Sequence, residues 1–189
     1  MDYPLPVIGF SAFSGTGKTT LLKRVLPLLQ VQGFRLGVIK HAHHNFDIDH
    51  PGKDSYELRH AGADKMLITS RRRMAVVEEF RERTSEPTLE QALDSLQPDD
   101  LDIILVEGFK AAHFPKIEIH RPELGKPVMF PNDKDIIAIA STATASELGI
   151  EADTPSPTYL KLNEPGDIVD FIIAFIKDSS RPVLRKQHA

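Results

Sequence analysis

The sequence predicts an α/β fold in which helices flank a mainly parallel sheet. Short apolar runs with the composition of strands alternate along the chain with segments of helical composition, as in successive βαβ units. The run at 101–106 has a continuously apolar interior, which is typical of a parallel strand buried on both faces. A glycine-rich turn joins the first predicted strand to the first predicted helix, which also favours the α/β class.

The predicted elements follow from apolar spacing and from the residues that begin and end helices. We expect strands at 7–10, 35–40, 65–69, 74–78, 101–106, 116–120, 136–140 and 159–162. We expect helices at 18–29, at 54–60 with Asp54 or Ser55 as the cap, from Ser85 or Thr88 to Leu96, and from Pro165 to Ile176.

Three of these strands do not fit a simple alternation. The segments 65–69 and 74–78 are joined by the turn 70–73, and 116–120 also lacks a flanking helix, so all three resemble hairpin strands. We therefore expect an antiparallel β extension beside the parallel sheet. An exposed strand edge in such an extension could pair with a second copy of the chain.

The glycine-rich turn is a phosphate-binding P-loop, which predicts a P-loop NTPase fold. Its glycines let backbone N–H groups face phosphate oxygens at the positive end of a helix. Lys18 is expected to reach the β- and γ-phosphates, and the Thr19 hydroxyl to bind Mg²⁺. Ala12 stands where a glycine is usual, and alanine fits there if its φ is negative. The predicted phosphate-binding residues are Ser14, Gly15, Thr16, Gly17, Lys18, Thr19 and Thr20.

Length and composition bound the remaining possibilities. We expect one P-loop nucleotide-binding domain at 1–178 and a disordered basic tail at 179–189. The absence of cysteine excludes disulfides, thiolate metal sites and cysteine nucleophiles. A net charge of −4 gives no general attraction for polyanions, so we expect no nucleic-acid partner. With no signal peptide and no apolar run near the length of a membrane span, we expect a cytoplasmic protein without a membrane partner.

A carboxylate is expected near the P-loop, at the end of a neighbouring buried strand, to hold the metal ion or its water. Glu107 follows the apolar run at 101–106, and we assign it to Mg²⁺ and to catalysis together with Lys18. The alternative is a solvated glutamate at a strand end. Gly108 and Lys110 come next, and Lys110 is either a phosphate ligand or an ordinary surface lysine.

A segment rich in histidine and aspartate begins where the strand 35–40 ends, at the edge where parallel sheets bind ligands. Lys40, His41, His43 and His44 are candidates for positioning the nucleotide phosphate, Mg²⁺ or an anionic substrate, and Asp47, Asp49 and Asp54 are candidate partners of the nucleotide-bound Mg²⁺ or its water. Asp47 and Asp49 are candidate catalytic residues. A zinc or nickel site formed by the histidines is the alternative, and Asp54 is equally explained as a helix cap.

The residues alone leave GTP and ATP open. Guanine-specific P-loop proteins often carry Asn-Lys-x-Asp, whose aspartate binds the N–H groups of guanine. The segment 132–135, Asn-Asp-Lys-Asp, has different spacing and precedes a strand, so we interpret it as a turn.

Four segments, 14–22, 39–44, 52–59 and 105–110, occur in the order found in the MobB family. The members of this family are molybdopterin-guanine dinucleotide biosynthesis adaptor proteins, and the chain resembles them over about 5–177. The P-loop is generic, whereas the histidine block followed by Asp-Ser-Tyr-Glu-Leu-Arg at 54–59 is more specific.

The resemblance implies a GTP-binding, weakly GTP-hydrolysing homodimer that uses Mg²⁺. It would assist MobA, the enzyme that joins GMP to molybdopterin. Molybdopterin bears a phosphate, for which Lys40, Arg59 and Lys110 offer basic groups, while the arginines at 71–73 are better explained as a solvated turn. Two other classes fit the P-loop: a small-molecule kinase or ATP-dependent synthetase with Asp47 or Asp49 as base, and a metallochaperone GTPase that uses the histidines.

Overall fold

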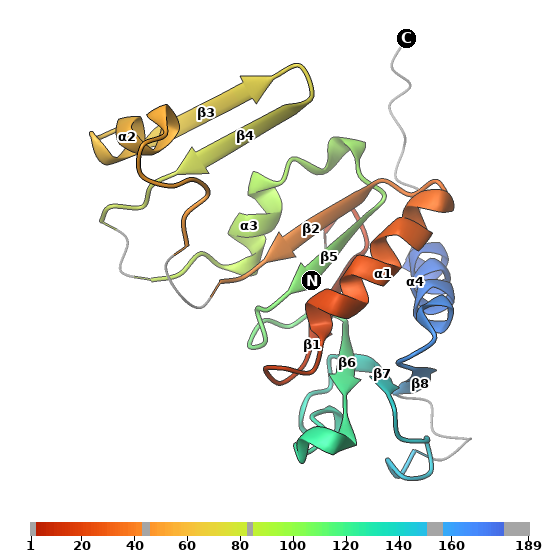
Figure 1. The fold of residues 1–189 in the computed structure, drawn as a ribbon. Helices are drawn as coiled ribbons and strands as arrows, with labels where there is room; N and C mark the ends of the chain where they lie inside the picture. The colour runs from red at the N-terminus through yellow and green to blue at the C-terminus, as the bar shows by residue number, and fades with distance from the viewer. Residues whose placement is uncertain (1–2, 43–45, 83–84, 151–156, 180–189) are drawn as a thin grey trace. The chain divides into compact units, whose positions relative to one another are not determined.

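The computed structural model describes residues 3–42, 46–82, 85–150 and 157–179. The chain forms two compact units, one of residues 1–41 and 88–189 and the other of residues 42–87. The first holds a six-stranded sheet with helices, and the second holds a two-stranded sheet with a helix (Figure 1). Compactness does not show whether the units fold separately, so the single domain at 1–178 stays a prediction. Residues 180–189 of the expected tail lie outside the described residues.

The sheet of the first unit is parallel throughout. In spatial order its strands are β2 (Leu36–Lys40), β5 (Ile103–Glu107), β1 (Val7–Ser11), β6 (Lys116–His120), β7 (Ile136–Ser141) and β8 (Thr158–Lys161). Because every neighbouring pair is parallel, the carboxyl ends of all these strands lie along one edge. The loop after central β1 therefore lies between the ends of β5 and β6.

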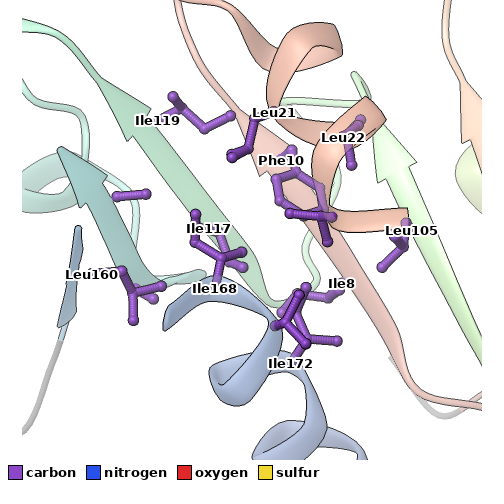
Figure 2. Packing of buried hydrophobic residues seen from close by; sticks show 14 of the residues in the cluster. Ile8, Phe10, Leu21, Leu22, Leu105, Ile117, Ile119, Leu160, Ile168 and Ile172 are labelled. Atoms are coloured by element: carbon purple, nitrogen blue, oxygen red, sulfur yellow. The ribbon is translucent and has the colours of Figure 1, made fainter. Parts of the chain in front are cut away.

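Helices cover both faces of this sheet. They are α1 (Lys18–Val31), α3 (Leu89–Ser95) and α4 (Pro165–Ser179), with short 3-10 turns η1 (Pro98–Asp100), η2 (Pro122–Leu124) and η3 (Phe130–Asn132). On the face of α1 and α4, Ile8 and Phe10 of β1 and Ile117 of β6 pack with Leu21 and Ile172 from the helices (Figure 2). Burial of each such side chain stabilises the folded state by about 1.5–3 kcal/mol, so this larger core contributes most to holding α1 and α4 against the sheet.

The opposite face is covered in part by α3, whose Leu89 and Leu93 pack against Val106 of β5. Thr88, one of the two predicted start residues, is the N-cap of α3. Its side chain accepts a hydrogen bond from the Gln91 backbone while the Gln91 side chain accepts one from the Thr88 backbone. This reciprocal capping satisfies two N–H groups that the first helical turn leaves open.

The assignment of 116–120 to an antiparallel extension is wrong. This segment is β6, which pairs in parallel with β1 on one side and with β7 on the other. Lys116, Glu118 and His120 alternate with isoleucines along this strand. All three polar side chains are in fact buried, because loops cover the face of β6 that carries them.

The second unit contains the predicted antiparallel extension. It consists of α2 (Asp54–His60) and the hairpin of β3 (Lys65–Ser70) and β4 (Arg73–Glu78). The expected cap of α2 is wrong: its N-cap is Lys53, and Asp54 is the first helical residue. The hairpin leaves Leu67, Met74 and Val76 exposed. Because Leu67 pairs with Val76, and Met74 lies two residues away on the same strand, the three share one face.

No helix among the described residues is both long and apolar enough to cross a membrane.

Candidate nucleotide-binding site

The P-loop runs from the end of β1 to the first turn of α1. Gly15 and Gly17 have φ angles of 80° and 95°, a left-handed region in which side chains are strained. Among the described non-glycine residues, positive φ occurs at Gln97 and Phe109, so Ala12 has the negative φ that alanine requires. Gly17 is the N-cap of α1 and has no side chain, which leaves the first N–H groups of the helix for a ligand.

Two kinds of residue can be distinguished within the loop. The Thr16 side chain is buried, and its hydroxyl donates a hydrogen bond of 2.7 Å to the Phe13 backbone oxygen. Thr16 therefore holds the loop in shape through its side chain. Ser14, Thr19 and Thr20 are exposed, so their hydroxyls are accessible at the mouth of the loop.

Lys18 lies across the loop, where its Nζ donates to the Ala12 backbone oxygen at 3.4 Å. Burial lowers the pKa of Lys18, and the charge of nearby Glu107 opposes that shift. The positive charges of Lys110 and Lys40 lower the pKa further. Glu107, Lys110 and Lys40, all predicted site residues, thus lie within electrostatic reach of Lys18.

The sheet register explains this convergence. Glu107, the last residue of β5, is paired with Phe10 of β1 and with Lys40 of β2. Glu107 is half-buried and its backbone oxygen accepts a hydrogen bond of 2.8 Å from His41. The parallel strands thus bring the ends of three distant segments to the P-loop, as the sequence predicted.

The backbone after β5 turns sharply at two consecutive left-handed residues, Gly108 (φ 103°) and Phe109 (φ 51°). A Cβ atom on Gly108 would lie 2.6 Å from the Cβ of His41, so only glycine fits. The Phe109 ring stacks on the His41 ring with centroids 4.4 Å apart. A non-glycine residue in this conformation is strained, which is common at ligand sites and directs the chain toward Lys110.

His41 thus packs against the residues that follow β5. His43 and His44 lie outside the described residues, so their predicted roles stay predictions. Within the part of the chain that the structure describes, no group of three or more His, Asp or Glu side chains is arranged to hold a metal ion.

In the second unit, Asp47 and Asp49 bind Arg59 of α2. The Arg59 guanidinium, whose side chain is 5% exposed, donates to both carboxylates and also to Glu79. These hydrogen bonds raise the pKa of Arg59 above its usual value. Arg59 is therefore a buried cation that is paired with three carboxylates. The expectation that it is available to bind the phosphate of molybdopterin is wrong. The catalytic role expected for Asp47 and Asp49 stays a prediction.

The interpretation of 132–135 as a turn is confirmed. Asp133 accepts a hydrogen bond from the Asp135 backbone, and both carboxylates form ion pairs with buried Lys116. His113 also binds Asp135, at 2.9 Å. Both aspartates of this segment are therefore engaged in bonds within the fold.

Sequence reasoning missed Arg121, which follows β6. Its Nε donates a hydrogen bond of 3.0 Å to the Thr16 backbone oxygen inside the P-loop. It also missed Lys126, whose Nζ lies 6.0 Å from the centroid of the Phe13 ring. The Nζ of Lys110 lies 5.7 Å from the same centroid. No motif marks these residues, because their partners are a backbone atom and a ring far away in the chain.

A P-loop after the central strand of a parallel sheet, with a carboxylate ending the neighbouring strand, defines a protein of the P-loop NTPase fold class. A family model described as "MobB: Molybdopterin guanine dinucleotide synthesis protein B" matches residues 7–142. The chain belongs to the MobB family.

Similar proteins that cover most of the chain belong to the same biosynthesis pathway by name. A molybdopterin-guanine dinucleotide biosynthesis adapter protein from Escherichia coli (strain K12) is 38% identical over 174 residues, 92% of this chain and 94% of the relative. A protein of the same name from Haemophilus influenzae is 36% identical over 173 residues, 91% of this chain and 90% of the relative. The crystal structure of a molybdopterin-guanine biosynthesis protein B superposes with a TM-score of 0.68, at 22% identity and over 90% of this chain and 99% of that one, which shows the shared fold.

Proposed function

We propose that this chain is a cytoplasmic GTP-binding adapter protein in molybdopterin guanine dinucleotide biosynthesis. It assists MobA in forming the dinucleotide and is itself at most a slow GTPase. The observation that carries the proposal is Lys18, held in the P-loop by its bond to Ala12 and lying within reach of the charges of Glu107, Lys40 and Lys110. The names of the relatives supply the pathway.

In this proposal the P-loop binds the nucleotide phosphates. The first N–H groups of α1 and the Lys18 ammonium group face the anion, and the lowered pKa of Lys18 reflects the burial and the crowding of cations that a phosphate would relieve. Lys40 and Lys110 add positive charge from the neighbouring strand ends.

Thr19 and Glu107 are the residues that would hold Mg²⁺. Thr19 offers an exposed hydroxyl at the start of α1, and Glu107 a carboxylate at the end of β5. Both are hard oxygen donors of the kind that Mg²⁺ prefers. When bound, the ion would neutralise part of the phosphate charge.

The choice of GTP rests on the family, because the described residues around the P-loop do not select a base. Calorimetric titration with GTP and with ATP tests it. We expect clear preference for GTP, and Lys18→Ala should weaken binding by about 1.5–3 kcal/mol through loss of a charge-assisted contact. Preference for ATP, or stoichiometric phosphoryl transfer to a metabolite, would contradict the proposal.

The second unit supports a homodimer. The hairpin of β3 and β4 is a two-stranded sheet with free edges in the described chain and an exposed apolar face of Leu67, Met74 and Val76. Such edges and faces are usually covered by another chain. Sedimentation at micromolar concentration should give the mass of a dimer, and Val76→Lys should shift it toward monomer; a monomeric wild-type mass would contradict the dimer.

A further inference from the structure

The residues that we assign to Mg²⁺ and phosphate beyond the P-loop come from one side of the central strand β1. Glu107 ends β5 and Lys40 ends β2, and both strands lie on the same side of β1. Mg²⁺ bridges the β- and γ-phosphates of a bound nucleotide, so the terminal phosphate belongs on that side. We therefore expect the ribose and the base to extend the other way, toward the ends of β6 and β7.

The ends of β6 and β7 lie side by side at the carboxyl edge of the sheet (Figure 1). Their last residues, His120 and Ser141, are partners in the strand register. Arg121 follows β6 directly, and its hydrogen bond of 3.0 Å to the Thr16 backbone oxygen ties it to the P-loop. The segments that follow these two strands therefore begin beside the loop that holds the phosphates.

The carboxylate of Glu123 joins these two segments. Glu123 lies in the turn η2 after β6, and Thr142 follows the last residue of β7. Both carboxylate oxygens of Glu123 accept from the Thr142 hydroxyl, at 3.1 and 3.2 Å. A carboxylate can accept about four hydrogen bonds, and Glu123 is an exposed residue, so acceptor sites remain open to a ligand.

Glu123 is ionised at neutral pH. A hydrogen bond from its own backbone N–H lowers the pKa of its carboxyl group, and the Thr142 hydroxyl and the positive charge of Arg121 lower it further. Partial loss of solvent opposes this shift without reversing it. The carboxylate can therefore only accept hydrogen bonds from a ligand and cannot donate one.

Guanine and adenine differ in what they offer to such an acceptor. Guanine has two neighbouring donors, its N1–H and its 2-amino group. Adenine has at the same two places a ring nitrogen with a lone pair and a C–H group, so it offers the carboxylate no N–H donor. A site built to accept from N–H groups discriminates strongly, because the wrong base leaves its polar group unpaired.

We propose that Glu123 selects the guanine base, with its carboxylate accepting from N1–H and the 2-amino group, and that Thr142 is the positioning residue that holds this carboxylate. The inference rests on the proposed function, in which the P-loop binds the triphosphate, and it deepens that function by naming the group that chooses the base. The residues around the P-loop bind the phosphates of either nucleotide. The carboxylates of Asp133 and Asp135 are paired with Lys116 instead.

Glu123→Gln tests the selection, because it keeps the size of the side chain and puts an NH₂ group where guanine needs an acceptor. Calorimetric titration should show GTP binding at least about tenfold weaker, through loss of a charge-assisted bond, and ATP binding no weaker than in the wild type. Xanthosine triphosphate has a C=O in place of the 2-amino group, so it should bind the variant more tightly than the wild type. Partial unfolding cannot produce such a gain.

Glu147→Gln is the matched control. Glu147 is another exposed glutamate after β7, and its carboxylate accepts a hydrogen bond of 2.8 Å from the hydroxyl of Thr144. Its variant should keep the wild-type ratio of GTP to ATP affinity. An equal change of this ratio in the two variants would indicate a general effect of charge and overturn the proposal, as would an equal loss of GTP and ATP binding in Glu123→Gln.

The positioning role of Thr142 has its own test. Thr142→Val removes the hydroxyl and keeps the shape, so the ratio of GTP to ATP affinity should fall, by less than in Glu123→Gln. Thr142→Ser keeps a hydroxyl and should restore most of the ratio. If Thr142→Val changed thermal stability and left the ratio unchanged, the positioning role would be wrong.

The wild-type titration separates this inference from the proposed function. Preference for GTP that persisted in Glu123→Gln would overturn the role of Glu123 and leave the proposed function in place. A wild type that bound GTP and ATP equally well would overturn the choice of guanine together with the role of Glu123. A wild type that bound neither nucleotide would overturn the proposed function as a whole.

Discussion

The Nε of Arg121 donates a hydrogen bond of 3.0 Å to the backbone oxygen of Thr16, 105 residues away in the chain. This contact joins the end of β6 to the P-loop. Because a trans peptide places its N–H opposite its C=O, fixing the Thr16 oxygen also fixes the direction of the Gly17 N–H. Arg121 thus orients a backbone donor of the loop without being part of the motif.

Arg121→Ala should therefore weaken GTP binding by up to about 1.5 kcal/mol, the net contribution of one hydrogen bond. Calorimetry of the variant measures this directly. Arg24→Ala is a suitable control, because Arg24 also donates to a backbone oxygen, that of Asn163, but on the exposed surface of α1. Equal affinities for the Arg121 and Arg24 variants would show that the P-loop keeps its shape unaided.

Glu107→Gln should lower GTP turnover more than GTP affinity. Glutamine has nearly the same shape but lacks the charge needed to hold Mg²⁺ or its water, whereas the P-loop contacts are retained. Single-turnover hydrolysis and calorimetry on the same preparation separate the two effects. Unchanged turnover would remove Glu107 from the mechanism.

Gly108→Ala should destabilise the protein by about 1–3 kcal/mol, because alanine is strained at a φ of 103°. The added Cβ would also approach the His41 Cβ to 2.6 Å. Gly166→Ala in α4 is the matched control, since a Cβ there meets nothing within 4 Å and alanine favours a helix. Urea unfolding of both variants gives the comparison; a neutral Gly108→Ala would contradict the backbone described here.

Asp49 should make stability depend on pH. Hydrogen bonds from Ser55 and then Arg59 lower the pKa of Asp49 in the folded protein. Its contribution is therefore fully present above the unfolded pKa of about 3.9 and is lost as pH falls through the lower folded value. Wild type should exceed Asp49→Asn in stability at pH 7, and the difference should shrink below about pH 4.

Chemical denaturation of the two proteins at pH 7 and pH 3 measures that difference. Asp170→Asn, at an exposed position of α4, should show no comparable change with pH. A difference between wild type and Asp49→Asn that was the same at both pH values would contradict the account of the Arg59 cluster.

Sequence reasoning worked where the signal is contiguous or periodic. The residues of the P-loop are neighbours in the sequence, and a buried strand such as 101–106 is recognised by its continuous apolar run. The bounds of the observed strands therefore lie within two residues of those predicted. The carboxyl ends of parallel strands lie along one edge of the sheet, so Glu107 and Lys40 could be placed beside the P-loop from their positions in the sequence. The observed strand register agrees with this placement.

The failures share one physical cause, which is that the partners of a side chain or strand are set by how the whole chain folds and not by the residues beside it in the sequence. The segment 116–120 resembled a hairpin strand because nothing in its own residues shows that it pairs in parallel with β1 and β7. Arg59 looked available because its three carboxylate partners were assigned elsewhere or ignored. Arg121 and Lys126 bind a backbone oxygen and a ring, and such partners leave no pattern in the sequence.

We propose that this chain uses bound GTP to support formation of the dinucleotide by MobA. Synthesis reconstituted with MobA at limiting GTP, with and without this protein, measures it most directly. We predict a higher yield of molybdopterin guanine dinucleotide in its presence, and loss of that gain with Lys18→Ala while the transfer activity of MobA itself is unchanged. No gain with the wild-type protein at any GTP concentration would contradict the claim.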